Sequence, residues 1–225
     1  MPDNAFASLS LEPVTTVDRV VDELRRAMFE GEIEPATPLR EVALADSLGV
    51  SRSTVREALG ILVAEGLAVR NPNRGTQVRD IDPAAIRDIC RARLVLETAG
   101  VARWNDCSEA SRDAVRTALT QFTELAQTRA SSVELTASHL DIHRAFVGLA
   151  ESARLTAMAD ALYAEIKLAL ARVDRVRRNA AEQVQSHAAL VRLLERGHLV
   201  EADAELLAHL EHAEVSMIAS VVSAS

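Results

Sequence analysis

The sequence is poor in the residues that build large β-sheets, disulfide scaffolds and membrane spans. Aromatic residues make up 3% of the 225 residues, and there are only 8 glycines and 6 prolines. Because 48% of the residues are nevertheless apolar, this composition favours a mainly α-helical chain. Two cysteines, Cys90 and Cys107, are too few for a disulfide framework, which favours a reducing compartment.

Membrane and export signals are also missing from the sequence. No apolar run approaches the roughly 20 residues that a helix needs to span a bilayer. The start, MPDNAFASLSLEPV, lacks the basic head and apolar middle of a signal peptide. We therefore expect a cytoplasmic protein with no membrane partner. Its 225 residues are enough for two domains.

Positive charge is scarce and unevenly distributed. The formal net charge is -8, and Lys167 is the only lysine. Residues 39–79 nevertheless hold six arginines against four acidic residues. A local positive stretch inside an acidic chain is compatible with a nucleic-acid-binding face, which needs local charge and not a basic whole.

The N-terminal third predicts three helices and a hairpin after a flexible lead at residues 1–14. Thr16 can cap a first helix that ends at Gly31. The stretch REVALADSLGV predicts a short second helix, with Val42 among its inward residues, and Ser51 can cap a third. Two short strands, LAVR and TQVRD, then flank the turn NPNRG.

This order of elements predicts a winged helix-turn-helix over residues 15–79. Its third helix would lie in the major groove of DNA, with Arg52, Ser53, Thr54 and Arg56 at the end that meets the bases. Arginine is suited to bidentate contact with guanine, and Ser or Thr can bond bases or phosphates. In the wing, Arg74 and the permissive Gly75 can approach the DNA backbone or the minor groove closely. A helical hairpin that only packs against a partner is the alternative.

The stretch LADSLGVSRSTVREALGILVAEGLAVRNPNRGTQV resembles the DNA-binding domain of the GntR family of bacterial regulators. The resemblance covers about residues 15–79. The family usually has Pro-Gly before its second helix, where this chain has Pro35-Ala36, and many members carry an arginine where Val42 stands. A DNA contact would be lost at Val42, and Arg40 is the candidate to replace it.

Residues 80–225 show no strand-like alternation and predict an all-α helical bundle. The expected helices are 83–104, 109–128, 132–150, 153–177, 179–196 and 201–221. Such a bundle behind a GntR-like head resembles the FCD subfamily (named from the FadR C-terminal domain), and the resemblance implies an antiparallel all-α helical bundle as the ligand domain. The stretch DICRARLVLETAGVARW resembles the first bundle helix of that subfamily, with Arg93 and Glu97 in its Arg-x-x-x-Glu pattern.

Four histidines have the spacing of a metal site in a helical bundle. His139 and His143 are four residues apart and share a helix face, and His187 and His209 lie on two further helices. The FCD metal pattern has Asp where this chain has His139. Asp141 is no substitute, because it falls on roughly the opposite face of the helix.

Nitrogen donors without a carboxylate favour a divalent transition metal, zinc first and nickel or cobalt next, over magnesium or calcium. Four neutral ligands would also leave the charge of the cation for an anionic effector to balance. The alternative is that these are ordinary core or surface histidines, as we expect of His198 and His212.

Arg93 is the candidate effector contact. In the FCD subfamily the matching arginine commonly faces the cavity and pairs with a carboxylate of the ligand. A buried arginine needs an anion, so Glu97 is the internal alternative to that ligand. Cys90, Trp104 and Tyr163 are expected to pack in the core.

The resemblance implies a homodimeric transcription regulator that binds a near-palindromic operator in double-stranded DNA. A small organic acid in the metal-containing bundle would modulate DNA binding. One alternative is a metal-dependent enzyme acting on a small carboxylate, although no HExxH arrangement supplies a general base. Another is a structural bundle with no small ligand.

Overall fold

The computed structural model describes residues 15–173 and 180–223 and confirms a mainly helical fold. Three helices and a hairpin form the head: α1 (Thr16–Phe29), α2 (Glu41–Leu48), α3 (Arg52–Ala64), β1 (Ala68–Asn71) and β2 (Gly75–Val78). The helices that follow form the bundle: α4 (Pro83–Val101), α5 (Glu109–Ala126), α6 (Ser132–Gly148), α7 (Ala153–Val173), α8 (Ala180–Glu195) and α9 (Leu199–Ser223).

Predicted helix boundaries lie within a few residues of those observed. The predicted lead at 1–14, the predicted helix end at 174–177 and the predicted helix start at 179 lie outside the described residues. No helix in the described part of the chain is long and apolar enough to cross a membrane.

The ends of the head helices follow local side-chain chemistry. Ser51 caps α3, as predicted, by accepting from the backbone N–H of Thr54 at 3.1 Å. Thr16 was the wrong cap for α1, because Thr15 accepts from the N–H of Asp18, which bonds back to the N–H of Thr15. This reciprocal capping box satisfies two free donors of the first turn and begins the helix at Thr16.

Val42 is the second departure from prediction. We expected its side chain inward on α2, but it is 52% exposed. The helix is only eight residues long and buries one residue, Ala45, fully. So short a helix has one narrow inward stripe, and Val42 falls outside it.

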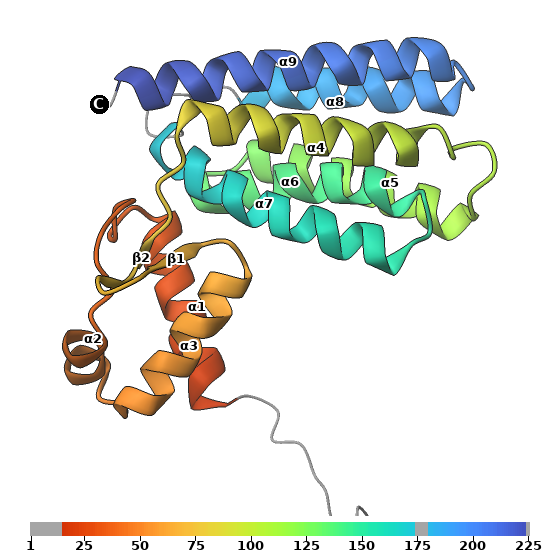
Figure 1. Ribbon diagram of the computed structural model, residues 1–225. Coiled ribbons are helices and arrows are strands. Elements are labelled where there is room, and N and C mark those ends of the chain that lie inside the picture. The colour runs from red at the N-terminus through yellow and green to blue at the C-terminus, as the bar shows by residue number, and fades with distance from the viewer. Residues whose placement is uncertain (1–14, 174–179, 224–225) are drawn as a thin grey trace, which may run out of the picture.

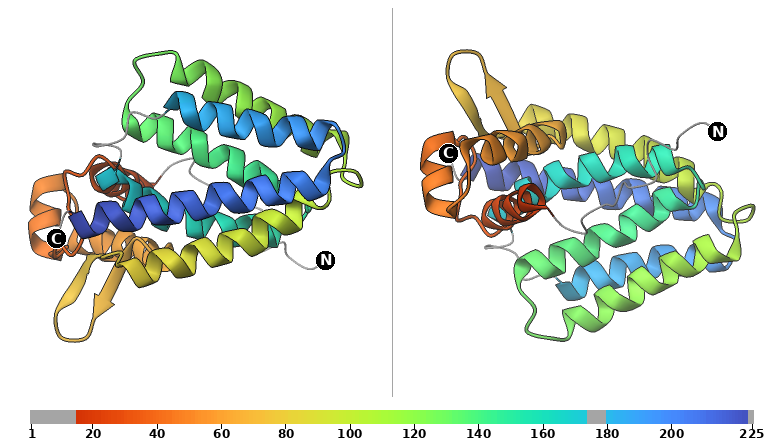
Figure 2. Two further views of the ribbon diagram at one scale, coloured as in Figure 1. Left: turned by 90° about the horizontal axis from the view of Figure 1, so that it is seen from above. Right: turned by 90° about the horizontal axis from the view of Figure 1, so that it is seen from below.

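The wing is an antiparallel hairpin in which Ala68 pairs with Val78 and Asn71 pairs with Gly75. It projects beyond the helices of the head (Figure 2). A β-bridge between Pro38 and Gln77 joins the segment before α2 to strand β2 of the wing. Just upstream, Ala36 adopts a left-handed φ of 64°. That conformation favours glycine, so Ala36 is held there at a steric cost.

The bundle is arranged around α6, which contacts α4, α5, α7 and α8. The helices lie roughly along one direction, with α8 and α9 forming one outer layer (Figure 1). Gly100 lets α4 approach α6 closely, since a Cβ there would lie 1.9 Å from the carbonyl oxygen of Phe146. This close approach brings the residues of α4 against the helix that carries two of the histidines.

The head lies under one end of the bundle, against α7 (Figure 1). Glu165 of α7 reaches the head, 3.7 Å from the guanidinium of Arg79 and close to Gly66. A groove of about 540 Å³ separates the head from α6 and α7, and Tyr163 is part of its wall. The two regions therefore share a packed boundary in which α7 is the common element.

Candidate nucleic-acid interface and metal centre

The N-terminal end of α3 presents polar side chains to solvent. Arg52 and Arg56 follow one helical turn apart, and their side chains are 62% and 58% exposed. Ser53 is exposed and Thr54 is half-buried, and both hydroxyls bond the Ser51 hydroxyl, at 2.7 and 2.8 Å. The opposite face of the helix, which includes Val55 and Leu59, is buried in the head. Of the residues predicted to meet DNA on this helix, Arg52, Ser53 and Arg56 are therefore exposed and Thr54 is half-buried.

Glu41, which sequence reasoning missed, lies at the same face. Its carboxylate accepts from Nε of Arg56 at 3.1 Å and from Nη2 at 2.7 Å, and it lies 4.0 Å from Nη2 of Arg52. The hydrogen bond from Arg56 lowers the pKa of Glu41, so this group is charged at neutral pH. An acid at the first position of the second helix is the only hint that the sequence offers.

The remaining predicted DNA contacts are also exposed. Arg40 is the residue before α2, Arg74 is in the turn of the wing, and Gly75 is the first residue of β2. Gly75 has a left-handed φ of 83°, with open space where a Cβ would lie. A backbone without a side chain at that point can approach a surface closely.

The four predicted metal ligands converge from α6, α8 and α9. Their nitrogens lie within 4.8 Å of one another, and His143 and His187 are buried. Nε2 of His143 lies 3.2 Å from Nε2 of His139 and 3.0 Å from Nε2 of His187. His198 and His212 are exposed and are not part of this histidine cluster, which consists of His139, His143, His187 and His209.

The hydrogen bonds at the Nδ1 atoms of His187 and His143 assign the tautomers of these two rings. Nδ1 of His187 lies 2.7 Å from the carbonyl oxygen of Gln183, which can only accept, so Nδ1 carries the proton. Nδ1 of His143 faces a carboxylate oxygen of Glu97 at 2.8 Å in the same way. Both Nε2 atoms therefore direct lone pairs at each other across 3.0 Å.

A cation would resolve this repulsion, because each lone pair would then coordinate it. Zinc–nitrogen bonds of about 2.0–2.1 Å in a tetrahedron place the nitrogens about 3.3 Å apart. This is close to the 3.2 and 3.0 Å that separate Nε2 of His143 from Nε2 of His139 and of His187, and all four ligand atoms lie within 4.8 Å of one another. Nε2 of His209 is buried and has no hydrogen-bond partner in the described part of the chain. The cluster fits a divalent transition metal by donor type, by spacing and by this unused lone pair.

Burial keeps the histidines neutral, which is the state that binds metal. It lowers the pKa of His187 to about 4 and is also the main cause that lowers the pKa of His209 to about 3. The pKa values of His139 and His143 lie well below their ordinary range for the same reason. Neutral imidazoles are available for coordination at physiological pH.

Behind the cluster, Arg93, Glu97 and Tyr163 form a buried polar group. Glu97 accepts from Nε of Arg93 at 2.9 Å and from the hydroxyl of Tyr163 at 3.1 Å, while its other oxygen bonds His143. The internal alternative for Arg93 is thus present. Yet Nη2 of Arg93, a residue 3% exposed, has no hydrogen-bond partner among the described residues.

Sequence reasoning did not find the hydrogen bonds that Tyr163 and Ser186 make around the histidine cluster. Tyr163 was assigned to packing, and the 66 residues that separate it from Glu97 leave no local signal. Ser186, whose hydroxyl lies 3.2 Å from Nδ1 of His209, was also missed. Such partners orient the ligands of metal sites.

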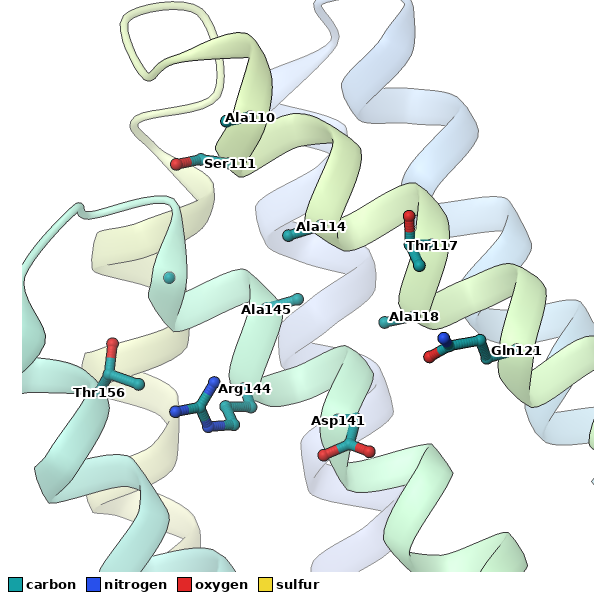
Figure 3. Close-up of a pocket in the computed structure, with 11 residues that line it drawn as sticks. Ala110, Ser111, Ala114, Thr117, Ala118, Gln121, Asp141, Arg144, Ala145 and Thr156 are labelled. Carbon is teal, nitrogen blue, oxygen red and sulfur yellow. The ribbon is translucent and has the colours of Figure 1, made fainter.

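A separate groove of about 520 Å³ lies on the outside of the bundle between α5, α6 and α7. Small side chains such as Ala114 and Ala145 line it, with Arg144 and Asp141 at one side (Figure 3). Asp141 faces this groove and is not part of the histidine cluster, as the helical phase predicted. Arg144 is held in an ion pair with Asp160 at 2.7 Å, so its charge is already matched.

Comparison with known proteins finds regulators for both regions. The family model "Bacterial regulatory proteins, gntR family" matches residues 16–78, and the FCD domain model matches residues 88–212. The probable D-xylose utilization operon transcriptional repressor of Paenarthrobacter nicotinovorans is 32% identical over 90% of this chain and 86% of that protein. The uncharacterized regulator YdhC of Bacillus subtilis is 31% identical over 36% of this chain and 36% of that protein.

Solved structures agree in fold. A GntR regulator from Rhodococcus sp. RHA1 has a TM-score of 0.76 at 27% identity, covering 92% of this chain and 99% of that one. McbR/YncC of E. coli has a TM-score of 0.72 at 18% identity, covering 91% of this chain and 97% of that one, which shows the fold alone. The matched families are transcriptional regulators and not enzymes, so the enzyme alternative is wrong.

Proposed function

Because the chain belongs to the GntR family of bacterial transcriptional regulators and carries an FCD domain, we propose that it is a metal-containing, effector-responsive regulator acting as a homodimer in the cytoplasm. Residues 15–79 bind a near-palindromic operator in double-stranded DNA. Residues 80–225 bind a metal and a small organic acid and join the two copies. The convergence of four neutral histidines beside a buried arginine with an unused donor carries this proposal.

In the proposed DNA complex, the exposed face of α3 enters the major groove. Arg52 and Arg56 read base edges, and Ser53 and Thr54 bond bases or phosphates. Arg40, Arg74 and Gly75 meet the DNA backbone on either side of this face. The exposure of these residues, apart from the half-buried Thr54, supports these roles.

A gel-shift comparison tests the DNA contacts. Arg56→Ala should weaken binding to a selected operator by about 1–3 kcal/mol and reduce its preference over scrambled DNA. Arg19→Ala, which removes the same charge from an exposed position on α1, is the matched control. Equal discrimination by Arg56→Ala and wild type would remove Arg56 from the base-reading residues.

For the metal site, we propose His139, His143, His187 and His209 as ligands of zinc, with nickel or cobalt as alternatives. When bound, a divalent ion supplies positive charge and a Lewis-acidic position for an oxygen ligand. Glu97, Gln183 and Ser186 hold the rings by their outer nitrogens.

Metal per chain, measured by mass spectrometry on protein without a His tag, tests this site. We expect about one zinc, nickel or cobalt ion per chain, lost in His143→Ala and retained in His198→Ala, whose histidine is exposed before α9. Equal metal content in wild type and His143→Ala would refute the assignment.

The proposed effector is an anion that takes the free side of the Arg93 guanidinium. Glu97 pairs with the single positive charge of Arg93, and the four histidines are neutral, so none of these groups supplies negative charge to balance a cation. A carboxylate of an organic acid has the charge and the acceptor geometry for Nη2. Organic acids that raise the melting temperature of wild type and not of Arg93→Lys would support this contact.

For the dimer, we place the contact on α9. Val200, Leu207, Val215 and Val222 form a stripe along this helix and are 39–81% exposed. An apolar stripe of this kind is typical of an interaction surface. Val215→Asp should convert a dimeric molar mass in light scattering to a monomeric one, and an unchanged mass would place the contact elsewhere.

A further inference from the structure

Glu41 is an acidic side chain within the DNA-binding face, where a negative charge is unfavourable. Its carboxylate is 30% exposed and lies against both arginines of α3. Phosphate oxygens carry the charge of DNA, so a carboxylate at this surface reduces sequence-independent attraction. An exposed ion pair of this kind also adds little to folding stability. Its presence at the DNA face therefore calls for a role in recognition.

The geometry of the pair identifies that role. A guanidinium has two edges that can make a bidentate contact, one formed by Nε and Nη2 and the other by Nη1 and Nη2. Glu41 accepts from Nε and Nη2 of Arg56, at 3.1 and 2.7 Å, and so occupies the first edge. The second edge is left for a bidentate acceptor such as O6 and N7 of guanine.

On the basis of the DNA contacts proposed above, we propose that Glu41 is a specificity-determining positioning residue, which holds Arg56 so that its Nη1–Nη2 edge reads a guanine. The ion pair fixes a long side chain before DNA arrives, which reduces the entropy lost on binding. It also lowers the positive charge at the face, which weakens non-specific binding. Both effects raise the ratio of specific to non-specific affinity without Glu41 touching a base.

In vitro selection from a randomised DNA duplex library, performed with the full-length protein, supplies the probe. Affinities are then measured for the selected duplex and for every single-base variant of it. The proteins compared are wild type, Glu41→Gln, Glu41→Ala, Arg56→Ala and the double variant Glu41→Gln with Arg56→Ala. Asp46→Asn is the matched control, because it removes one negative charge from the same helix and Asp46 makes no ion pair within the described residues.

We expect Glu41→Gln and Glu41→Ala to lower discrimination about tenfold at the base pair where Arg56→Ala also loses it. Affinity for scrambled DNA should stay the same or rise, and its salt dependence should steepen. In the double variant, Glu41→Gln should cause no loss of discrimination beyond that of Arg56→Ala. Asp46→Asn should keep the discrimination of wild type.

Two results would overturn the proposal. Wild-type discrimination in both Glu41 variants would show that Arg56 needs no positioning. A loss at a base pair that Arg56→Ala leaves unaffected would show that Glu41 reads a base itself. Melting temperatures close to wild type in all variants would establish that neither result comes from misfolding.

Discussion

Arg52, Ser53, Thr54 and Arg56 form what we call the recognition face of the head. This face and the histidine cluster of the bundle place candidate functional side chains in opposite environments. Arg52 and Arg56 stand on an exposed helix surface, and the core of the head consists of other residues. His143 and Glu97 are 0% exposed and lie between packed helices. The candidate functional residues of the head therefore lie outside its hydrophobic core, whereas those of the bundle lie within the core.

This difference has a consequence for mutation. An exposed polar residue can be removed with little change in folding free energy, because water replaces its partners. A buried polar group must keep its partners, since a charge or donor left unpaired in the interior is costly. We therefore expect DNA binding to be separable from stability in the head, but metal binding and stability to change together in the bundle.

Arg93→Ala should cause the largest loss in the free energy of unfolding, and it is the strongest test of the buried environment. It leaves the carboxylate of Glu97 buried without its cationic partner. Breaking a buried ion pair from one side costs about 3–5 kcal/mol. Urea unfolding at pH 7 measures this loss, and a change below 1 kcal/mol would show that water reaches Glu97.

Gly100→Ala should destabilise the bundle by about 3 kcal/mol, as expected for overpacking against backbone. The added Cβ would lie 1.9 Å from the carbonyl oxygen of Phe146, so α4 must move away from α6. Because α6 carries His139 and His143, metal content should fall as well. Unfolding midpoints and metal per chain measure both effects.

Gly148→Ala is the matched control for that prediction. It lies at the end of α6, with nothing within 4 Å of the added Cβ. It should leave metal content unchanged and alter stability by no more than about 1 kcal/mol, in the stabilising direction. Similar losses in both variants would mean that close approach at Gly100 is not the cause.

Acid should destabilise the metal-free protein through the same buried histidines. The pKa is about 4 for His187 and about 3 for His209 in the folded state, against about 6.5 when unfolded. Below pH 6.5 the unfolded chain binds protons that the folded chain does not, so stability is complete above 6.5 and falls toward pH 4. From pH 7 to pH 5.5, these two groups together should cost about 2–3 kcal/mol.

Unfolding free energies in the presence of a chelator measure this pH dependence. His187→Gln should flatten the dependence by the share of one histidine. A pH dependence that is the same in wild type and His187→Gln would contradict burial of a neutral His187.

Features that depend on residues close together in the sequence could be predicted from the sequence. Helical periodicity and the spacing of His139, His143, His187 and His209 placed four candidate ligands on three helices, because each helix fixes the phase of its own residues. The cap at Ser51 was likewise local. These features need no knowledge of how distant segments pack.

The features that could not be predicted are contacts between segments distant in sequence. Glu41 meets Arg56 from another helix, and Tyr163 meets Glu97 across 66 residues. Val42 was misplaced because the inward stripe of an eight-residue helix is too short to show its phase in sequence. Tertiary packing decides all three, and a single sequence carries no direct signal of it.

Arg52→Ala should give the smallest effect on stability and completes the comparison with Arg93→Ala, since the same side chain is removed from opposite environments. Arg52 is 62% exposed, and its nearest acidic partner, Glu41, lies 4.0 Å away. We expect its unfolding free energy to stay within about 0.5 kcal/mol of wild type, while operator affinity falls by about 1–3 kcal/mol. Urea unfolding and gel shift on one preparation measure both. If Arg52→Ala lowered stability as much as Arg93→Ala, the recognition face would be part of the folding core, and the separation of the two environments would fail.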